Sequence, residues 1–229
     1  MEPCRGALAD ILLVLDNASH TAARPGTTRL LAVSKTRTSS EIAALAAAGQ
    51  RAFGENYVQE ALPKIDDLHG HGLEWHLIGH LQSNKADVAA RAFDWVQSVD
   101  RIKLVAALAR HRPSDLPPLN VLLQVNIDDE TGKHGCDPQA IDALADAVSA
   151  ESRLLLRGLM AIPAPFDDMA RRRDAFRAMR RLFDALQSRH PGIDTLSMGM
   201  SEDFAPAIEE GATMVRIGSA LFGPRPAKR

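Results

Sequence analysis

The feature that most constrains the fold is a regular alternation of short apolar segments with longer amphipathic segments along nearly the whole chain. Short apolar runs predict buried strands, whereas apolar residues that recur every three or four positions predict helices. Strands are expected at 30–35, 51–57, 74–80, 94–99, 119–126, 154–162, 195–199 and 214–218, and a helix is expected after each of them. Strict alternation of this kind is typical of a parallel sheet covered by helices.

The number of repeats and the chain length narrow the fold further. Eight strand–helix units in 229 residues favour a closed (β/α)8 TIM barrel, slightly more compact than the usual case. An open doubly wound sheet is the alternative, but no Gly-x-Gly-x-x-Gly motif follows the first strand. Apolar residues at helical spacing over 8–15 predict an extra helix before the barrel. We therefore expect one α/β barrel domain over residues 1–229.

Composition argues against several classes of partner. The formal net charge of -2 offers no basic surface for nucleic acid or for an acidic membrane. Cys4 and Cys136 lie far apart and form neither a metal-binding Cys-x-x-Cys motif nor a disulfide framework, which is typical of a reducing cytoplasm. Neither a signal peptide nor an apolar segment of membrane-spanning length is evident in the sequence. We expect a cytoplasmic protein that binds neither membranes nor nucleic acid.

One pair of histidines invites a metal interpretation. His76 and His80 are four residues apart beside Glu74, the spacing at which two histidines share one face of a zinc-binding helix. The residues around them predict a strand, so the spacing argument fails. We expect structural or rim histidines and no metal site.

The functional residues are expected at the carboxyl ends of the strands. Lys35 closes the first strand, and apolar surroundings would lower the pKa of its amine and make it a nucleophile toward carbonyl compounds. Active sites of such barrels lie at the carboxyl ends of the strands, and phosphate groups are often bound by the loops after strands seven and eight. Those loops are rich in glycine and serine here, at 197–201 and 216–219, and predict a phosphate site.

A lysine beside a phosphate site suits two chemistries. One is a pyridoxal 5′-phosphate (PLP) cofactor held as a Schiff base on Lys35, and the other is a Schiff-base sugar-phosphate aldolase. No carboxylate pair is evident at the rim, which disfavours the aldolase. Strand alternation puts Met214, Arg216 and Gly218 on one face. If that face is inward, Arg216 can donate to an unprotonated pyridine nitrogen and weaken the ring as an electron sink. The alternative is that Arg216 pairs with a buried carboxylate.

Six motifs closely resemble the pyridoxal phosphate homeostasis protein family, over about residues 30–223. They are Ala32–Thr36, Phe53–Tyr57, Trp75–Lys85, Gly158–Ala161, Leu196–Ser201 and Val215–Gly218. The resemblance implies a (β/α)8 barrel like the N-terminal domain of alanine racemase. It also implies PLP-binding roles for the lysine, for phosphate and pyridine-nitrogen contacts, and for residues near the ring: Lys35, Asn56, Met198, Ser201, Arg216, Gly218 and Ser219.

The function that follows is the binding of PLP in intracellular PLP homeostasis, without robust catalysis and with no catalytic residue assigned. Apo forms of PLP-dependent enzymes are considered as acceptors, and a monomer is expected. The alternative is a low-activity PLP-dependent amino-acid racemase. The resemblance implies that efficient racemases of this fold take their second base from a further domain. Because the chain ends at Arg229, such a domain is not expected here.

The sequence also suggests roles for several residues outside these motifs or not assigned to the PLP site. The arginines at 171–173 and 180–181 are expected on the solvent face of a long helix. Trp75 and Trp95 are expected to pack the barrel, and Cys136 is expected to be a partly exposed thiol. Lys133, in a polar loop at 128–135, is considered for a second, weak PLP encounter site.

Overall fold

The computed structural model describes residues 2–22, 28–128, 132, 134–164 and 168–223, with side chains from residue 6 onward. Eight parallel strands close into a barrel in sequence order, so the predicted fold is confirmed. The strands are β1 (Arg29–Val33), β2 (Ala52–Glu55), β3 (Glu74–Leu77), β4 (Trp95–Val99), β5 (Leu119–Gln124), β6 (Leu154–Met160), β7 (Thr195–Ser197) and β8 (Met214–Ile217). Closure is made by β1, which pairs with both β2 and β8.

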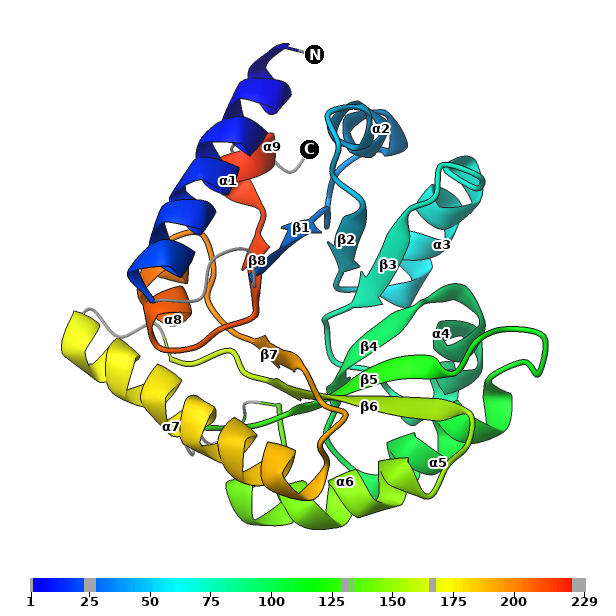
Figure 1. Cartoon of the computed structure of the whole chain (residues 1–229). Helices are drawn as coiled ribbons and strands as arrows, with labels where there is room; N and C mark the ends of the chain where they lie inside the picture. The colour runs from blue at the N-terminus through cyan, green and yellow to red at the C-terminus, as the bar shows by residue number, and fades with distance from the viewer. Residues whose placement is uncertain (1, 23–27, 129–131, 133, 165–167, 224–229) are drawn as a thin grey trace.

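Helices cover the outside of the barrel (Figure 1). They are α2 (Ser39–Ala47), α3 (Val58–Asp67), α4 (Ala86–Ala92), α5 (Ile102–His111), α6 (Ile141–Ser149), α7 (Met169–Arg189), α8 (Phe204–Glu209) and α9 (Ser219–Phe222), with short 3-10 turns at Ser83–Lys85 and Pro138–Ala140. The expected extra helix is α1 (Glu2–Thr21), which packs against α8 and α9. Within the described part of the chain, no helix combines the length and apolar character needed to cross a membrane.

The two helices α2 and α5 begin differently. Thr38 is the N-cap of α2 and forms a capping box with Glu41, although the neighbouring serines Ser39 and Ser40 are also good capping residues by type. Arg101 is the N-cap residue of α5, and no side chain caps this helix. The carboxylate of the preceding Asp100 accepts a hydrogen bond from Arg101.

The interior of the barrel combines an apolar part with a polar part. Leu31, Ala52, Ile78 and Met214 form one apolar cluster, and Trp95 forms another with two further side chains. Beside them in the interior lie the fully buried polar side chains of three strands, His76, Gln97 and Ser197, together with the buried Arg216. Met214 and Arg216 therefore share the inward face of β8, as predicted. The two tryptophans pack the structure, Trp75 against Phe53 outside the barrel and Trp95 against His76 inside it.

Candidate functional site

A cavity of about 320 Å³ opens at the carboxyl ends of the strands, between the segments that follow β1, β6, β7 and β8. It gathers five of the seven predicted binding residues: Lys35, Ser201, Arg216, Gly218 and Ser219. Its remaining walls are formed by Val33, Thr36, Arg37, Pro163, Ala164, Arg172, Met200, Glu202 and Asp203. An amine, a guanidinium and two hydroxyls thus face one small volume.

Lys35 lies in a turn two residues beyond the end of β1 rather than inside the strand. The turn is shaped by Thr36, which adopts a positive φ of 64°, and by its backbone N–H, which donates to Glu60 of α3. A non-glycine residue in this region of φ is uncommon and must be held there by its surroundings. The surroundings of this turn therefore fix where the lysine enters the cavity.

A buried lysine, Lys64 of α3, supplies that support. Its ammonium donates to the carbonyl oxygen of Ser34 at 3.0 Å, to Glu55 at 2.9 Å and to Glu60 at 2.8 Å. The Ser34 hydroxyl also donates to Glu55, at 2.6 Å. Burial raises the pKa of Glu55, although Ser34 and Lys64 oppose this effect. In the sequence Lys64 follows a proline inside a helix and looks like a solvent-facing residue, so local pattern does not predict its role.

Arg216 reaches the floor of the cavity from inside the barrel. Its guanidinium donates to the Ser197 hydroxyl and to the carbonyl oxygen of Ala161, both at 2.8 Å. Burial lowers its pKa to about 10, while the charge of Asp203 opposes that shift. The arginine therefore stays charged at neutral pH. Its two described bonds are to neutral oxygens, so the alternative of a hydrogen-bonded pair with a buried carboxylate is not what these contacts show.

The loops after β7 and β8 approach each other closely. The hydroxyl oxygens of Ser201 and Ser219 are 3.5 Å apart. Gly199 adopts a φ of 90°, and a Cβ there would lie 2.6 Å from that of Ala207. A Cβ at Gly218 would lie 3.2 Å from the carbonyl oxygen of Val33. Glycine is thus needed at position 199, and the small size of Gly218 lets the loop after β8 lie close beside β1.

Arg37 connects the end of α9 to the segment that follows β1. Its buried guanidinium donates to the carbonyl oxygens of Phe222, at 3.2 Å, and Gly223 at the end of α9. The same side chain forms an ion pair with Glu41 of α2. The serine of α9 and the lysine after β1 are therefore held in one unit, although they lie far apart in the sequence.

Arg172 corrects one prediction about the long helix. It was expected on the solvent face of α7, but its side chain is only 13% exposed and lines the cavity, 3.8 Å from Asp203. Arg173, its neighbour, does follow the expected pattern and forms ion pairs with Glu209 and Glu210 of α8. Arg172 therefore adds a cation to the cavity wall, as Arg37 does, and neither was among the predicted site residues.

Two predicted binding residues lie outside the cavity lining. Asn56 follows β2, and its carbonyl oxygen would be 2.1 Å from a Cβ at Gly79, so the two loops are in close contact. Met198 is fully buried in the outer core, and its backbone N–H donates to Met214. The Met198 side chain points away from the cavity because strand alternation directs its neighbour Ser197 inward. A side-chain contact from Met198 to a ligand in this cavity is therefore not supported.

The remaining predicted features lie elsewhere. Cys136 was expected to be partly exposed, but it is buried, and burial raises the pKa of its thiol to about 11. His80 and His134 stack with ring centroids 3.7 Å apart, near Asp100. Their planes differ by only 11°, so their nitrogen lone pairs do not converge on one point as metal ligands do. Lys133 lies outside the described residues.

The chain matches the family described as alanine racemase, N-terminal domain, over residues 14–226. It is 51% identical over 219 residues to the pyridoxal phosphate homeostasis protein of Escherichia coli (strain K12), covering 93% of this chain and 94% of that protein. It is 50% identical over 219 residues to the Pseudomonas aeruginosa protein of the same name, covering 95% and 94%.

Solved structures agree with these matches. PipY of Synechococcus elongatus PCC7942, solved with PLP bound, is 38% identical and superposes with a TM-score of 0.79, covering 92% of this chain and 99% of that one. Alanine racemase from Corynebacterium glutamicum superposes with a TM-score of 0.71 at 19% identity, over 97% of this chain and 62% of that chain. The second likeness concerns the fold alone.

Proposed function

This chain belongs to the family of pyridoxal phosphate homeostasis proteins, and from that premise we propose that it holds PLP in the cavity at the ends of β1, β7 and β8. The observation that supports this most directly is the grouping of Lys35, Arg216, Ser201 and Ser219 around about 320 Å³. These groups match, in turn, an aldehyde, a pyridine nitrogen and a phosphate.

Each group has a distinct task. Lys35 would hold PLP covalently through its aldehyde carbon, with the loss of one water. The serine hydroxyls and the backbone beside Gly218 bind phosphate, and Arg172 supplies a nearby positive charge. When bound, PLP supplies an aldehyde and an electron-accepting ring. The residues of the chain bind and orient it.

Arg216 explains why binding need not lead to fast catalysis. Its pKa of about 10 keeps it a donor at neutral pH, so it favours an unprotonated pyridine nitrogen. Such a nitrogen withdraws electrons weakly, which disfavours the carbanion chemistry of typical PLP enzymes. We therefore propose a PLP-holding protein, acting as a monomer and passing PLP to apo forms of PLP-dependent enzymes.

The test is a calorimetric titration of the full chain with PLP, pyridoxal and pyridoxamine phosphate. The proposal expects PLP to bind most tightly, because the second ligand lacks the phosphate and the third lacks the aldehyde. Equal affinity for PLP and pyridoxal would contradict the phosphate site. Amino-acid racemization at about 1 s⁻¹ or faster would replace the holding function with that of an enzyme.

A further inference from the structure

A continuous line of side-chain hydrogen bonds crosses the barrel interior beneath Arg216. The guanidinium donates to the Ser197 hydroxyl at 2.8 Å, and that hydroxyl donates to Gln97 Oε1, also at 2.8 Å. Gln97 Nε2 lies 2.9 Å from His76 Nδ1, and His76 Nε2 lies 2.7 Å from Glu74. Ser197, Gln97 and His76 are fully buried.

The direction of every bond in this line follows from the chemistry of its ends. A guanidinium has no acceptor, so Ser197 must accept from Arg216 and donate its own proton to Gln97. Gln97 then uses its oxygen toward Ser197 and its NH₂ group toward His76. Because that group donates to Nδ1, the imidazole is neutral and carries its proton on Nε2, which donates to Glu74.

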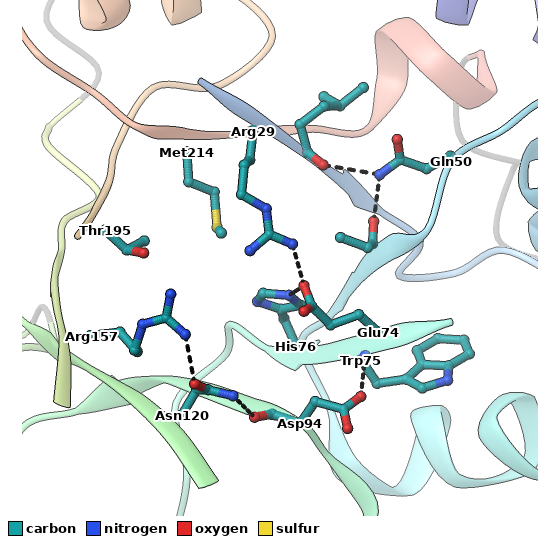
Figure 2. Close-up of polar contacts among 12 residues, drawn as sticks. Arg29, Gln50, Glu74, Trp75, His76, Asp94, Asn120, Arg157, Thr195 and Met214 are labelled. Carbon is teal, nitrogen blue, oxygen red and sulfur yellow. Dashed lines mark hydrogen bonds and ion pairs between the residues drawn. The ribbon is translucent and has the colours of Figure 1, made fainter. Parts of the chain in front are cut away.

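The far end of the line is anchored at the opposite mouth of the barrel. Figure 2 shows the Arg29 side chain reaching toward Glu74, with His76 beside that carboxylate. The contact between Arg29 and Glu74 measures 2.6 Å. Burial would raise the pKa of Glu74, but His76 and Arg29 hold it at about 2. The carboxylate therefore stays ionised and remains an acceptor for His76.

We propose that Gln97 is a positioning residue for the ring of the bound ligand, through its hold on Ser197 and hence on Arg216. This inference rests on the proposed function, because it assigns the pyridine nitrogen to Arg216. Two neutral oxygens orient this guanidinium, and only that of Ser197 is itself fixed by a side chain. A primary amide is required at position 97, since it must accept at one end and donate at the other.

Substitution of Gln97 tests whether this residue positions Arg216 or only stabilises the fold. Gln97→Met keeps the length of the side chain but can neither accept from Ser197 nor donate to His76. Gln50→Met is the matched control, because Gln50 is also a buried glutamine, in the connection that precedes β2. Its NH₂ group donates to the carbonyl oxygens of Leu30 and Ala52, at 2.9 and 2.7 Å. Those bonds make no connection with Arg216, so the control costs stability alone.

The first measurement uses ligand-free protein and is independent of the proposed function. Nitrogen-15 spectra of the arginine side chains should show hindered rotation of the Arg216 guanidinium in the parent and in Gln50→Met. In Gln97→Met and Ser197→Ala, we expect this rotation to become fast. Unchanged rotation of the Arg216 guanidinium in a folded Gln97→Met protein would overturn the inference. Equally fast rotation in the Gln50→Met control would also overturn it.

The second measurement uses PLP labelled with nitrogen-15 in the ring. In Gln97→Met we expect PLP affinity to fall about tenfold. The ring-nitrogen signal should move toward the protonated position, while borohydride still labels Lys35. Parent-like affinity and signal would overturn the inference. If the parent itself fails to bind PLP, the proposed function is wrong, and the ligand-free spectra still decide whether Gln97 orients Arg216.

Discussion

The ammonium of Lys64 lies 2.9 Å from the carboxylate of Glu55, and the two side chains are only 8% and 0% exposed. This pair sits directly behind the turn that carries Lys35. Because Lys64 also donates to the carbonyl oxygen of Ser34, the pair fixes the backbone of that turn as well as the charge of Glu55. A helix residue outside the cavity lining thus supports the turn from which Lys35 enters the cavity.

Removing this ammonium should destabilise the protein strongly. Lys64→Met leaves the Glu55 carboxylate buried without a cation, and we expect a loss of about 3–5 kcal/mol of unfolding free energy. Urea denaturation at pH 7 measures this loss. In the double variant Glu55→Gln/Lys64→Met the uncompensated charge is gone, so most of the stability should return. A double variant as unstable as the single one would show that the cost is not electrostatic.

The loop after β7 should tolerate no side chain at Gly199. Gly199→Ala places a Cβ 2.6 Å from Ala207 at a positive φ, and we expect a loss of about 2–4 kcal/mol. Gly192→Ala is the control, because a Cβ there meets nothing within 4 Å and φ is not positive. The control should change stability by less than about 1 kcal/mol. Thermal melting of both variants measures this difference in stability. Similar losses of stability in the two variants would contradict the steric role of Gly199.

Stability should fall on mild acidification because of His76. Burial lowers the pKa of this histidine below its usual 6.5, so it contributes stability above about pH 6.5 that is lost as pH decreases. The unfolding free energy should therefore decline below pH 6.5, by up to about 1.4 kcal/mol per pH unit. The contribution of Glu74 persists to lower pH, since its pKa is about 2.

Urea denaturation between pH 7.5 and pH 5 tests this dependence. His76→Gln should be less stable than the parent at pH 7.5 but should show a flatter pH profile. His80→Gln is the comparison, because the His80 pKa is also lowered but its side chain is 30% exposed. An equal slope in the parent and in His76→Gln would contradict the assignment.

Arg172 should contribute to ligand affinity through its charge. Arg172→Gln removes a cation from the cavity wall, and we expect PLP to bind about tenfold more weakly with a smaller dependence on salt. Arg181→Gln, an exposed position on the same helix, should bind PLP as the parent does. Fluorescence titration at two salt concentrations measures both. Identical PLP affinities in the two variants would show that the charge of Arg172 does not contribute to binding.

The barrel and most of its site were predictable because both follow from local pattern. The alternation of strand and helix requires a parallel sheet, and the ends of parallel strands meet at one mouth, which brings Lys35 together with Ser201 and Ser219. Strand alternation likewise predicted that Arg216 points inward, and it could have shown that Met198 points outward.

The supporting residues were not predictable in this way. Lys64 and Arg172 look like ordinary helix-surface cations in the sequence, and only closure of the barrel places one behind β2 and the other over the cavity. The partners of Gln97 come from β3, β7 and β8: His76, Ser197 and Met214. Such contacts depend on the register and stagger of the closed barrel, which no local pattern specifies.

We propose above all that Lys35 is the residue that binds PLP covalently. The most direct test is to incubate the full chain and Lys35→Ala with PLP, reduce both with borohydride, and map the modified peptide by mass spectrometry. We predict a stable phosphopyridoxyl label on Lys35 in the parent, at one equivalent per chain, and no label in the cavity of the variant. A parent that stays unlabelled, or a label carried mainly by another lysine, would contradict the account.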